Sequence, residues 1–259
     1  MATRCAITKY NSANVADRLN DNNVAGGKLF TSVWMQRAAE YKALCEQAYN
    51  IATLRVNEYL QHGNASKPLA IVTDIDETFL DNSPYAVHRA LQGKDYTDAS
   101  WRDWTSRAEA DTLCGALDFF KYAAAKGVTV FYITNRGETE RLGTLKNLQK
   151  FGFPFADSSH LFLMNTTSSK EARRQIVERN SNIILLLGDN LGDFSALFDH
   201  KTETERSENV LSNKDEFGKK FIVLPNPNYG DWEGALYHYN YKFTPAQKDS
   251  VFKANAQSY

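Results

Sequence analysis

Five short apolar runs separated by longer helical stretches constrain the fold of this 259-residue chain more than any other feature. The runs are continuous rather than alternating, which is typical of strands buried on both faces of a sheet. Parallel strands need helical crossovers, so we predict an α/β fold, a three-layer sandwich with a mainly parallel central sheet. The predicted strands are 69–73, 128–134, 161–164, 183–187 and 221–224, and the predicted helices are 115–126, 138–151, 168–179 and 193–199.

The amino-terminal part has a different pattern. The first thirty residues are polar, rich in Asn and contain Gly26-Gly27, so we expect an irregular arm. From Trp34 to Tyr59 apolar residues recur every three or four positions, which predicts one long amphipathic helix that ends near Gly63. We therefore assign residues 1–68 to an arm and the long helix of a small α domain.

About fifty residues separate the first two predicted strands, more than a crossover helix requires. The excess, 82–114, predicts a helical insert that packs with the amino-terminal helix, and the α/β core then comprises 69–81 and 115–259. The insert leaves from the carboxyl end of the first strand, where open α/β sheets bind ligands. It is therefore expected to cover a site there. The charge-rich segment 201–220 is predicted to be a solvated connection.

Composition excludes some classes of partner. Thirty Lys and Arg residues nearly balance 31 Asp and Glu residues, so no global field would attract a nucleic-acid polymer or an anionic membrane. Small molecules are the expected partners. Cys5, Cys45 and Cys114 lack the spacing of a zinc site or a disulfide framework. The amino terminus lacks the apolar centre of a signal peptide, which leaves open a cytoplasmic location or an export signal outside this sequence.

Acidic residues follow two of the predicted strands. Asp74 and Asp76 are two apart on an extended segment and should project to the same side, whereas Asp189 and Asp193 follow the fourth strand and Gly188. If these strands are neighbours, the carboxylates converge and require a cation, protons or dense hydrogen bonding. An oxygen-only cluster favours a hard cation, Mg²⁺ in particular.

Polar residues suited to an anion follow the other two strands. Thr134, Asn135 and Arg136 end the second strand, and Lys170 comes after the third. Each has an ordinary explanation by itself, because Asp pairs and Thr often cap helices and a single lysine is usually exposed. Their occurrence at four successive strand ends favours one shared site.

This order of residues resembles the four motifs of the haloacid dehalogenase superfamily. The match is closest to its class C acid phosphatases, a bacterial group of secreted or lipid-anchored enzymes that includes 5′-nucleotidases. Their two signatures resemble DIDETFLDNSPY and ILLLGDNLGDF, and the segments 33–50 and 224–236 resemble the amino-terminal helix and carboxyl-terminal loop of the family.

The resemblance implies a Mg²⁺-dependent phosphomonoesterase with one Mg²⁺ per subunit. It implies that Asp74 is the nucleophile and forms an aspartyl-phosphate, and that Asp76 is the general acid and base. The metal ligands would be the Asp74 and Asp189 carboxylates and the Asp76 carbonyl, with Asp193 orienting a metal-bound water or Lys170. Thr134 and Lys170 would hold the phosphoryl oxygens.

Aromatic residues lie in the insert and near the strand ends, where flat rings could sandwich a nucleobase or an aryl leaving group, or could pack the insert onto the core. Resemblance to the family favours contact with the substrate, and His88, His160 and His238 show no ligand spacing. The expected substrate-binding residues are Tyr85, Trp101, Trp104, Asn135, Arg136 and Tyr229.

The expected substrates are small phosphomonoesters, nucleoside monophosphates and aryl phosphates among them. A non-catalytic binding or storage protein on the same scaffold and a phosphotransferase are the alternatives. Family resemblance suggests a periplasmic, outer-membrane or extracellular location, with membrane contact only through a lipid anchor outside this sequence. The aromatic-rich long helix leaves room for a homodimer.

Overall fold

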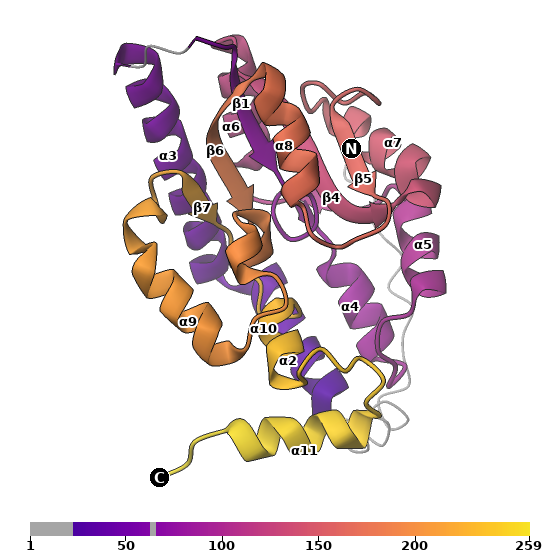
Figure 1. The fold of residues 1–259 in the computed structure, drawn as a ribbon. Coiled ribbons are helices and arrows are strands. Elements are labelled where there is room, and N and C mark those ends of the chain that lie inside the picture. Colours follow the sequence, from indigo (N-terminus) through magenta and orange to yellow (C-terminus); the bar gives the residue numbers. More distant parts are fainter. Residues whose placement is uncertain (1–22, 63–65) are drawn as a thin grey trace.

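A five-stranded parallel sheet forms the centre of the protein (Figure 1). The computed structural model describes residues 23–62 and 66–259. The strand order is β5-β4-β1-β6-β7, so β1 lies in the middle with β4 and β6 as its neighbours. The predicted α/β fold with a mainly parallel sheet is confirmed. The strands are β1 (Leu69–Thr73), β4 (Thr129–Gly137), β5 (Leu161–Met164), β6 (Asn182–Gly188) and β7 (Phe221–Val223).

Helices cover both faces of the sheet because successive strand residues point to opposite sides. Ile71 belongs to the larger apolar core on one face, and Val72 belongs to the smaller core on the other. The larger core is completed by side chains of α3 (Ala39–His62), α6 (Ala116–Ala125) and α7 (Arg141–Phe151), and the smaller one by α8 (Glu171–Asn180).

The amino-terminal helix differs from the prediction in two ways. Residues 23–30, expected in the arm, are helical, and the single predicted helix is two helices, α2 (Asn23–Arg37) and α3, which meet at Ala38. The two helices have different partners, since α2 packs against the insert whereas α3 packs against α6 and the sheet. A break lets each apolar face reach its own partner. The arm before residue 23 and Gly63 lie outside the described residues.

The insert 82–114 contains two helices, α4 (Ser83–Ala90) and α5 (Asp98–Arg107). A two-stranded antiparallel ribbon of β2 (Leu80–Asp81) and β3 (Asp111–Thr112) joins its ends to the core. Helix α4 packs against α2, and α5 packs against α7. The insert therefore contacts both the amino-terminal helix and the α/β core.

Two other predictions were wrong. Segment 193–199 forms two 3₁₀ turns, Leu191–Asp193 and Ala196–Phe198, because the Asp193 side chain accepts the Asn190 N–H and closes a tight turn. Segment 201–220 is not simply a connection, since it contains α9 (Glu203–Ser212). Thr202 and Glu205 form a capping box at its start, a sequence signal that the high charge of the segment obscured.

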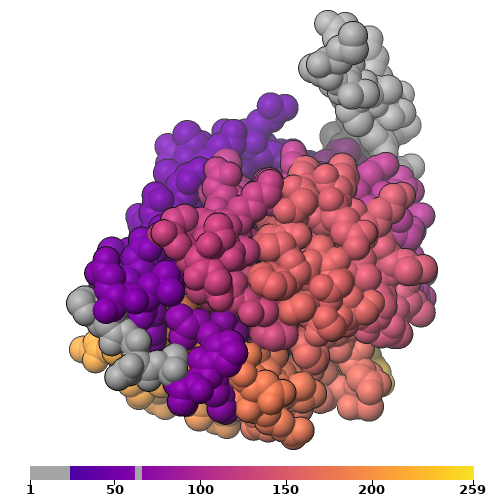
Figure 2. Space-filling model, turned by 90° about the horizontal axis from the view of Figure 1, so that it is seen from above, coloured from indigo at the N-terminus to yellow at the C-terminus, as the bar shows by residue number. Residues whose placement is uncertain are grey.

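The carboxyl-terminal segment adds α10 (Asp231–Leu236) and α11 (Pro245–Asn255), which lie at the lower end of Figure 1, toward which the strands point. Figure 2 views the molecule from above, where segments from indigo to orange form the visible surface and little of the yellow carboxyl-terminal part is seen. Among the helices in the described ranges, none combines the length and apolarity needed to cross a bilayer.

The close packing of α5 against α7 depends on Gly143. A Cβ at Gly143 would lie 2.4 Å from the Thr105 carbonyl oxygen and 3.0 Å from Ser106 Cα, both backbone atoms of α5. Alanine normally stabilises a helix relative to glycine, but here it forces the two helices apart. We predict that Gly143→Ala lowers the free energy of unfolding by about 1–3 kcal/mol, as overpacking does elsewhere.

Urea unfolding measures this change. The matched control is Leu142→Ala on the same helix, where the side chain is 82% exposed and the expected change is within about 0.5 kcal/mol. A Gly143→Ala protein as stable as wild type would contradict the close approach of α5 and α7.

Candidate functional site

The carboxyl end of β1 turns sharply and presents two aspartates to one cavity. The Asp74 N–H donates to the Leu187 carbonyl oxygen, which continues the pairing of β1 with β6 for one more residue. Ile75 is fully buried in the core, and Asp74 and Asp76 both line the cavity. The alternation expected of an extended segment therefore holds as far as Asp76. At Glu77 the backbone enters the left-handed region, with φ 53°.

The end of β6 brings two further aspartates beside Asp74. Gly188 permits this, because a Cβ there would lie 2.3 Å from Asp193 Cβ. Asp193 can thus fold back over the strand end. Asp74, Asp189 and Asp193 each offer a carboxylate oxygen, and these three atoms lie within 4.8 Å of one another. Because oxygen donors at this spacing suit a hard cation, the cluster is a candidate metal centre.

Lys170 balances part of this negative charge. It directly precedes α8 and is 5% exposed, and its Nζ lies 2.5 Å from Asp74 Oδ1 and 2.7 Å from Asp193 Oδ1. Burial alone would lower the pKa of Lys170, but Asp193 and Asp74 raise it above its usual value. The side chain is therefore a buried ammonium that joins the acidic residues of two strands.

The carboxylates do not all ionise easily without a further cation. Burial raises the pKa of Asp74 to about 7, because it outweighs the attraction of Lys170 and is reinforced by Asp193 and Asp76. Burial and repulsion from Asp193 and Asp74 likewise raise the pKa of Asp189 well above its usual value. Asn226 Nδ2 donates to Asp189 Oδ2 at 2.7 Å and offsets only part of this cost.

The end of β4 supplies a hydroxyl and an amide. Thr134 is fully buried and lines the cavity, and its Oγ1 accepts the Arg136 N–H at 3.1 Å. Arg173 of α8 holds this segment, since Nη1 donates to the Thr134 carbonyl oxygen at 2.5 Å and Nη2 to Asn135 Oδ1 at 2.7 Å. This role of Arg173 was not predicted, because it depends on the packing of α8 beside β4.

Arg136 lines the cavity, and protein groups accept hydrogen bonds from its guanidinium. It is 2% exposed, and its Nη2 donates to Asp76 Oδ1 at 2.6 Å while its Nη1 donates to Thr144 at 3.0 Å. The guanidinium carbon also lies 5.8 Å from the centre of the Trp101 ring. Arg136 therefore lies beside Asp76 at the cavity, where the two side chains form a buried ion pair.

Glu77 is a site residue to which sequence reasoning assigned no role. It is 1% exposed, and its carboxylate accepts the Asn82 backbone N–H at 2.9 Å and the Tyr229 hydroxyl. Burial and repulsion from Asp76 raise its pKa well above the usual value. The contact ties the loop before α10 to the turn after β1. Its position next to Asp76 in the acidic run was the available sequence signal.

The cavity above these residues has a volume of about 560 Å³. Of the six residues expected to bind the substrate, Trp104 is not among the lining residues, whereas the other five line the cavity: Tyr85, Trp101, Asn135, Arg136 and Tyr229. The rings of Tyr85 and Trp101 meet edge to face, with centres 5.0 Å apart. A cavity of this size, with acids at its base and rings on its wall, can hold a small organic anion.

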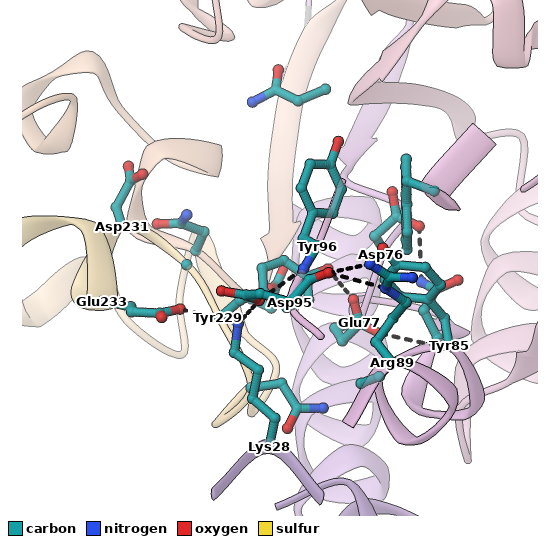
Figure 3. Close-up of a pocket in the computed structure, with 18 of the residues that line it drawn as sticks. Lys28, Asp76, Glu77, Tyr85, Arg89, Asp95, Tyr96, Tyr229, Asp231 and Glu233 are labelled. Carbon is teal, nitrogen blue, oxygen red and sulfur yellow. Dashed lines mark hydrogen bonds and ion pairs between the residues drawn. The ribbon is translucent and has the colours of Figure 1, made fainter. Parts of the chain in front are cut away.

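Charged residues from three separate segments line the far end of the cavity. Lys28 of α2 and Lys248 of α11 contact the two carboxylate oxygens of Asp95 in the insert, at 2.9 and 2.6 Å. In Figure 3, Asp76 and Glu77 lie near Tyr85, whereas Lys28 reaches toward Asp95 and Glu233 farther along the cavity. We refer to Lys28, Asp95 and Lys248 as the roof cluster. The sequence analysis missed it, because its members are far apart in the chain.

Known proteins show the same architecture. The family described as HAD superfamily, subfamily IIIB (acid phosphatase) matches residues 6–232. The class C acid phosphatase from Bacillus anthracis matches with 43% identity and a TM-score of 0.88, over 91% of this chain and 99% of that chain. Its tungstate-bound structure gives the same identity and TM-score, over 91% of this chain and 98% of that chain.

Curated plant proteins are more distant. Acid phosphatase 1 of Solanum lycopersicum is 29% identical over 130 residues, which are 47% of this chain and 50% of that protein. The stem 31 kDa glycoprotein of Glycine max is 24% identical over 161 residues, 60% of this chain and 57% of that protein. The chain thus spans about half the length of the curated relatives it matches.

The family resemblance expected from the motifs is confirmed. Because the family match covers most of the chain and the fold agrees with that of a class C enzyme, the chain belongs to subfamily IIIB of the HAD superfamily, the acid phosphatases, which are phosphoric monoester hydrolases.

Proposed function

We propose that this protein is a Mg²⁺-dependent acid phosphatase that hydrolyses small phosphomonoesters, nucleoside 5′-monophosphates and aryl phosphates among them. The observation that carries the proposal is the contact of buried Lys170 with Asp74 and Asp193, beside Asp189 and at the base of a cavity lined by Thr134. A nucleophilic carboxylate, an ammonium and a hydroxyl at one point suit phosphoryl transfer, which depends mainly on positioning and electrostatics.

The donor set fits Mg²⁺. The carboxylates of Asp74 and Asp189, together with the Asp76 carbonyl, are proposed as its protein ligands, with the remaining positions left to water and substrate oxygens. When bound, the ion supplies positive charge that stabilises the phosphoryl oxygens and keeps the nearby carboxylates ionised. Asp193 is proposed to hold Lys170, given its 2.7 Å contact with the ammonium.

Four residues of the chain are proposed to take separate roles in the reaction. Asp74 attacks phosphorus and carries the phosphoryl group as an aspartyl-phosphate, which splits one difficult hydrolysis into two displacements. Lys170 and the Thr134 hydroxyl hold phosphoryl oxygens during both steps. Asp76 protonates the departing oxygen in the first step and removes a proton from the attacking water in the second.

The wall of the cavity supports the substrate proposal. Tyr85, Trp101 and Tyr229 offer flat apolar surface, which suits a nucleobase or an aryl group without reading its identity. The class C acid phosphatase from Bacillus anthracis binds tungstate, which is a tetrahedral oxyanion like phosphate, and this supports a phosphoryl site in the related chain. Transfer of the phosphoryl group to an alcohol would use the same intermediate and remains the second candidate activity.

Two further expectations concern the whole protein. Export from the cytoplasm is proposed on the resemblance to class C enzymes alone.

A homodimer is proposed because α2 exposes Phe30 (77%) and Val33 (47%), apolar side chains that a second copy could cover. Light scattering measures the mass, and Phe30→Glu should convert a dimer to a monomer. A monomeric wild type would contradict the proposed homodimer.

Replacing the nucleophile tests the reaction. We predict that Asp74→Asn lowers hydrolysis of p-nitrophenyl phosphate by at least about 10³-fold, because an amide cannot form the covalent intermediate. Acid quenching of wild type during turnover should trap phosphate on the peptide that contains Asp74. The control Asp103→Asn, on the exposed face of α5, should keep wild-type activity. Equal rates for Asp74→Asn and wild type would remove Asp74 from the mechanism.

Mg²⁺ binding should depend on pH with a defined sign. The pKa of Asp74 is about 7 in the fold and 3.8 as its ordinary value, so the folded, metal-free protein holds this proton more tightly than the unfolded chain. The stability that Asp74 contributes is complete below about 3.8 and lost as pH rises through about 7. Because the ion competes with the proton, we predict that Mg²⁺ affinity rises up to about tenfold per pH unit until pH reaches about 7.

Calorimetry in buffers of different ionisation enthalpy measures both the affinity and the proton release, without reference to activity. In Asp74→Asn, binding should be weaker and the part of the pH dependence due to Asp74 should disappear. Affinity that is independent of pH in wild type would contradict the proposed ligand.

A further inference from the structure

Trp104 was expected to stack on the substrate, but its contacts point elsewhere. It is half-buried and lies outside the lining of the cavity, and its Nε1–H donates to Asn82 Oδ1 at 2.8 Å. Asn82 is 2% exposed, and its Nδ2 donates to Asp76 Oδ1 at 2.9 Å. An unbroken chain of two hydrogen bonds thus connects the insert to the Asp76 carboxylate.

The direction of this chain is fixed by chemistry. An indole nitrogen can only donate, so the Asn82 side chain must turn its oxygen toward Trp104. Its NH₂ group is then directed at Asp76. In the opposite orientation two donors would face each other at Trp104, and the Asn82 oxygen would face a carboxylate.

The hydrogen bonds divide the two oxygens of Asp76 unequally. Oδ1 accepts from Asn82 Nδ2 at 2.9 Å, from Arg136 Nη2 at 2.6 Å and from Arg136 Nε at 3.1 Å. Within residues 23–62 and 66–259, Oδ2 accepts only the shared Arg136 Nε, also at 3.1 Å. Three donors leave Oδ1 no room for another partner, whereas Oδ2 keeps acceptor capacity. Only Oδ2 is available to exchange a proton with a substrate.

We propose that Trp104 is a positioning residue, which acts through Asn82 and together with Arg136 to turn Asp76 Oδ2 toward the leaving group. The inference rests on the proposed function. Trp101 and Trp104 are three residues apart on α5. The Trp101 ring lies next to the Arg136 guanidinium, and the Trp104 N–H donates to Asn82, so one helix supports both partners of Asp76. The insert would then orient the catalytic acid in addition to lining the cavity.

Asp76 exchanges one proton in each half of the proposed reaction. As an Asp74 oxygen bonds to phosphorus, the bond from phosphorus to the leaving oxygen breaks, its electron pair stays on that oxygen, and the oxygen takes the proton from Asp76 Oδ2. In the second half, a water oxygen bonds to phosphorus, the bond from phosphorus to Asp74 breaks, and the water proton returns to Asp76. Esters with a basic leaving oxygen depend on this proton, whereas p-nitrophenolate leaves without it.

Trp104→Phe keeps the ring and removes the donor. We expect kcat/KM for glycerol 2-phosphate to fall by roughly 10- to 100-fold and kcat/KM for p-nitrophenyl phosphate by less than about 3-fold. Asn82→Ala should reproduce this selective loss, which keeps the test valid if Trp104→Phe does not fold. In the double variant the loss should not exceed that of Asn82→Ala, because both residues act through one contact. Ser106→Ala, an exposed change on the same helix, is the control and should leave both substrates unaffected.

The possible outcomes separate the competing roles of Trp104. Equal losses on both esters would indicate a structural role and overturn the proposal, as would additive losses in the double variant. A rise in KM for adenosine 5′-monophosphate, with the alkyl ester unaffected, would restore the stacking role and overturn it too. If the wild-type protein hydrolyses neither ester, the proposed function is overturned, and the positioning role of Trp104 is overturned with it.

Discussion

The buried contact of Lys170 with Asp74 and Asp193 is the interaction on which the rest of the site depends. Three carboxylates within 4.8 Å of one another repel strongly where water is scarce, and removing the ammonium would leave that repulsion without a protein cation. These contacts join the end of β1 to the turn after β6, and Lys170, the residue directly before α8, supplies the cation. The strand order that forms the core therefore also brings the carboxylates together at the edge of the sheet. A divalent cation would offset the repulsion among them that Lys170 does not offset.

Much of this arrangement could be predicted from the sequence. Continuous apolar runs identify buried strands, and Asp74, Thr134, Lys170 and Asp189 each follow one of them, so a parallel sheet brings them to one edge. What could not be predicted is which side of a helix faces the cavity. Trp101 and Trp104 are similar in sequence context, yet only Trp101 lines the cavity, because the partner of Trp104 is set by the packing of α5 on α7 and on Asn82.

Other differences have equally local causes. Arg136, expected to contact the substrate, lines the cavity, but its ion pair with Asp76 could not be predicted because the two residues belong to different strand ends. The break at Ala38 depends on two separate packing partners, which no periodicity in the sequence reveals. Segment 201–220 was judged by its charge, although Thr202 and Glu205 carried a helix-start signal. Long-range contacts such as that between Lys28 and Asp95 have no sequence pattern at all.

The roof cluster has a consequence for the conditions under which this protein can work. Burial alone would raise the pKa of Asp95, but Lys28 and Lys248 hold it well below its ordinary value. A carboxyl group of this kind contributes stability above its unfolded pKa and loses it only as pH falls through the lower, folded value. The three chain segments above the cavity therefore stay fastened together in mildly acidic surroundings, where ordinary surface carboxylates begin to take up protons. The tolerance of these two ion pairs to mild acid is thus a property of the roof cluster, separate from the reacting groups at the base of the cavity.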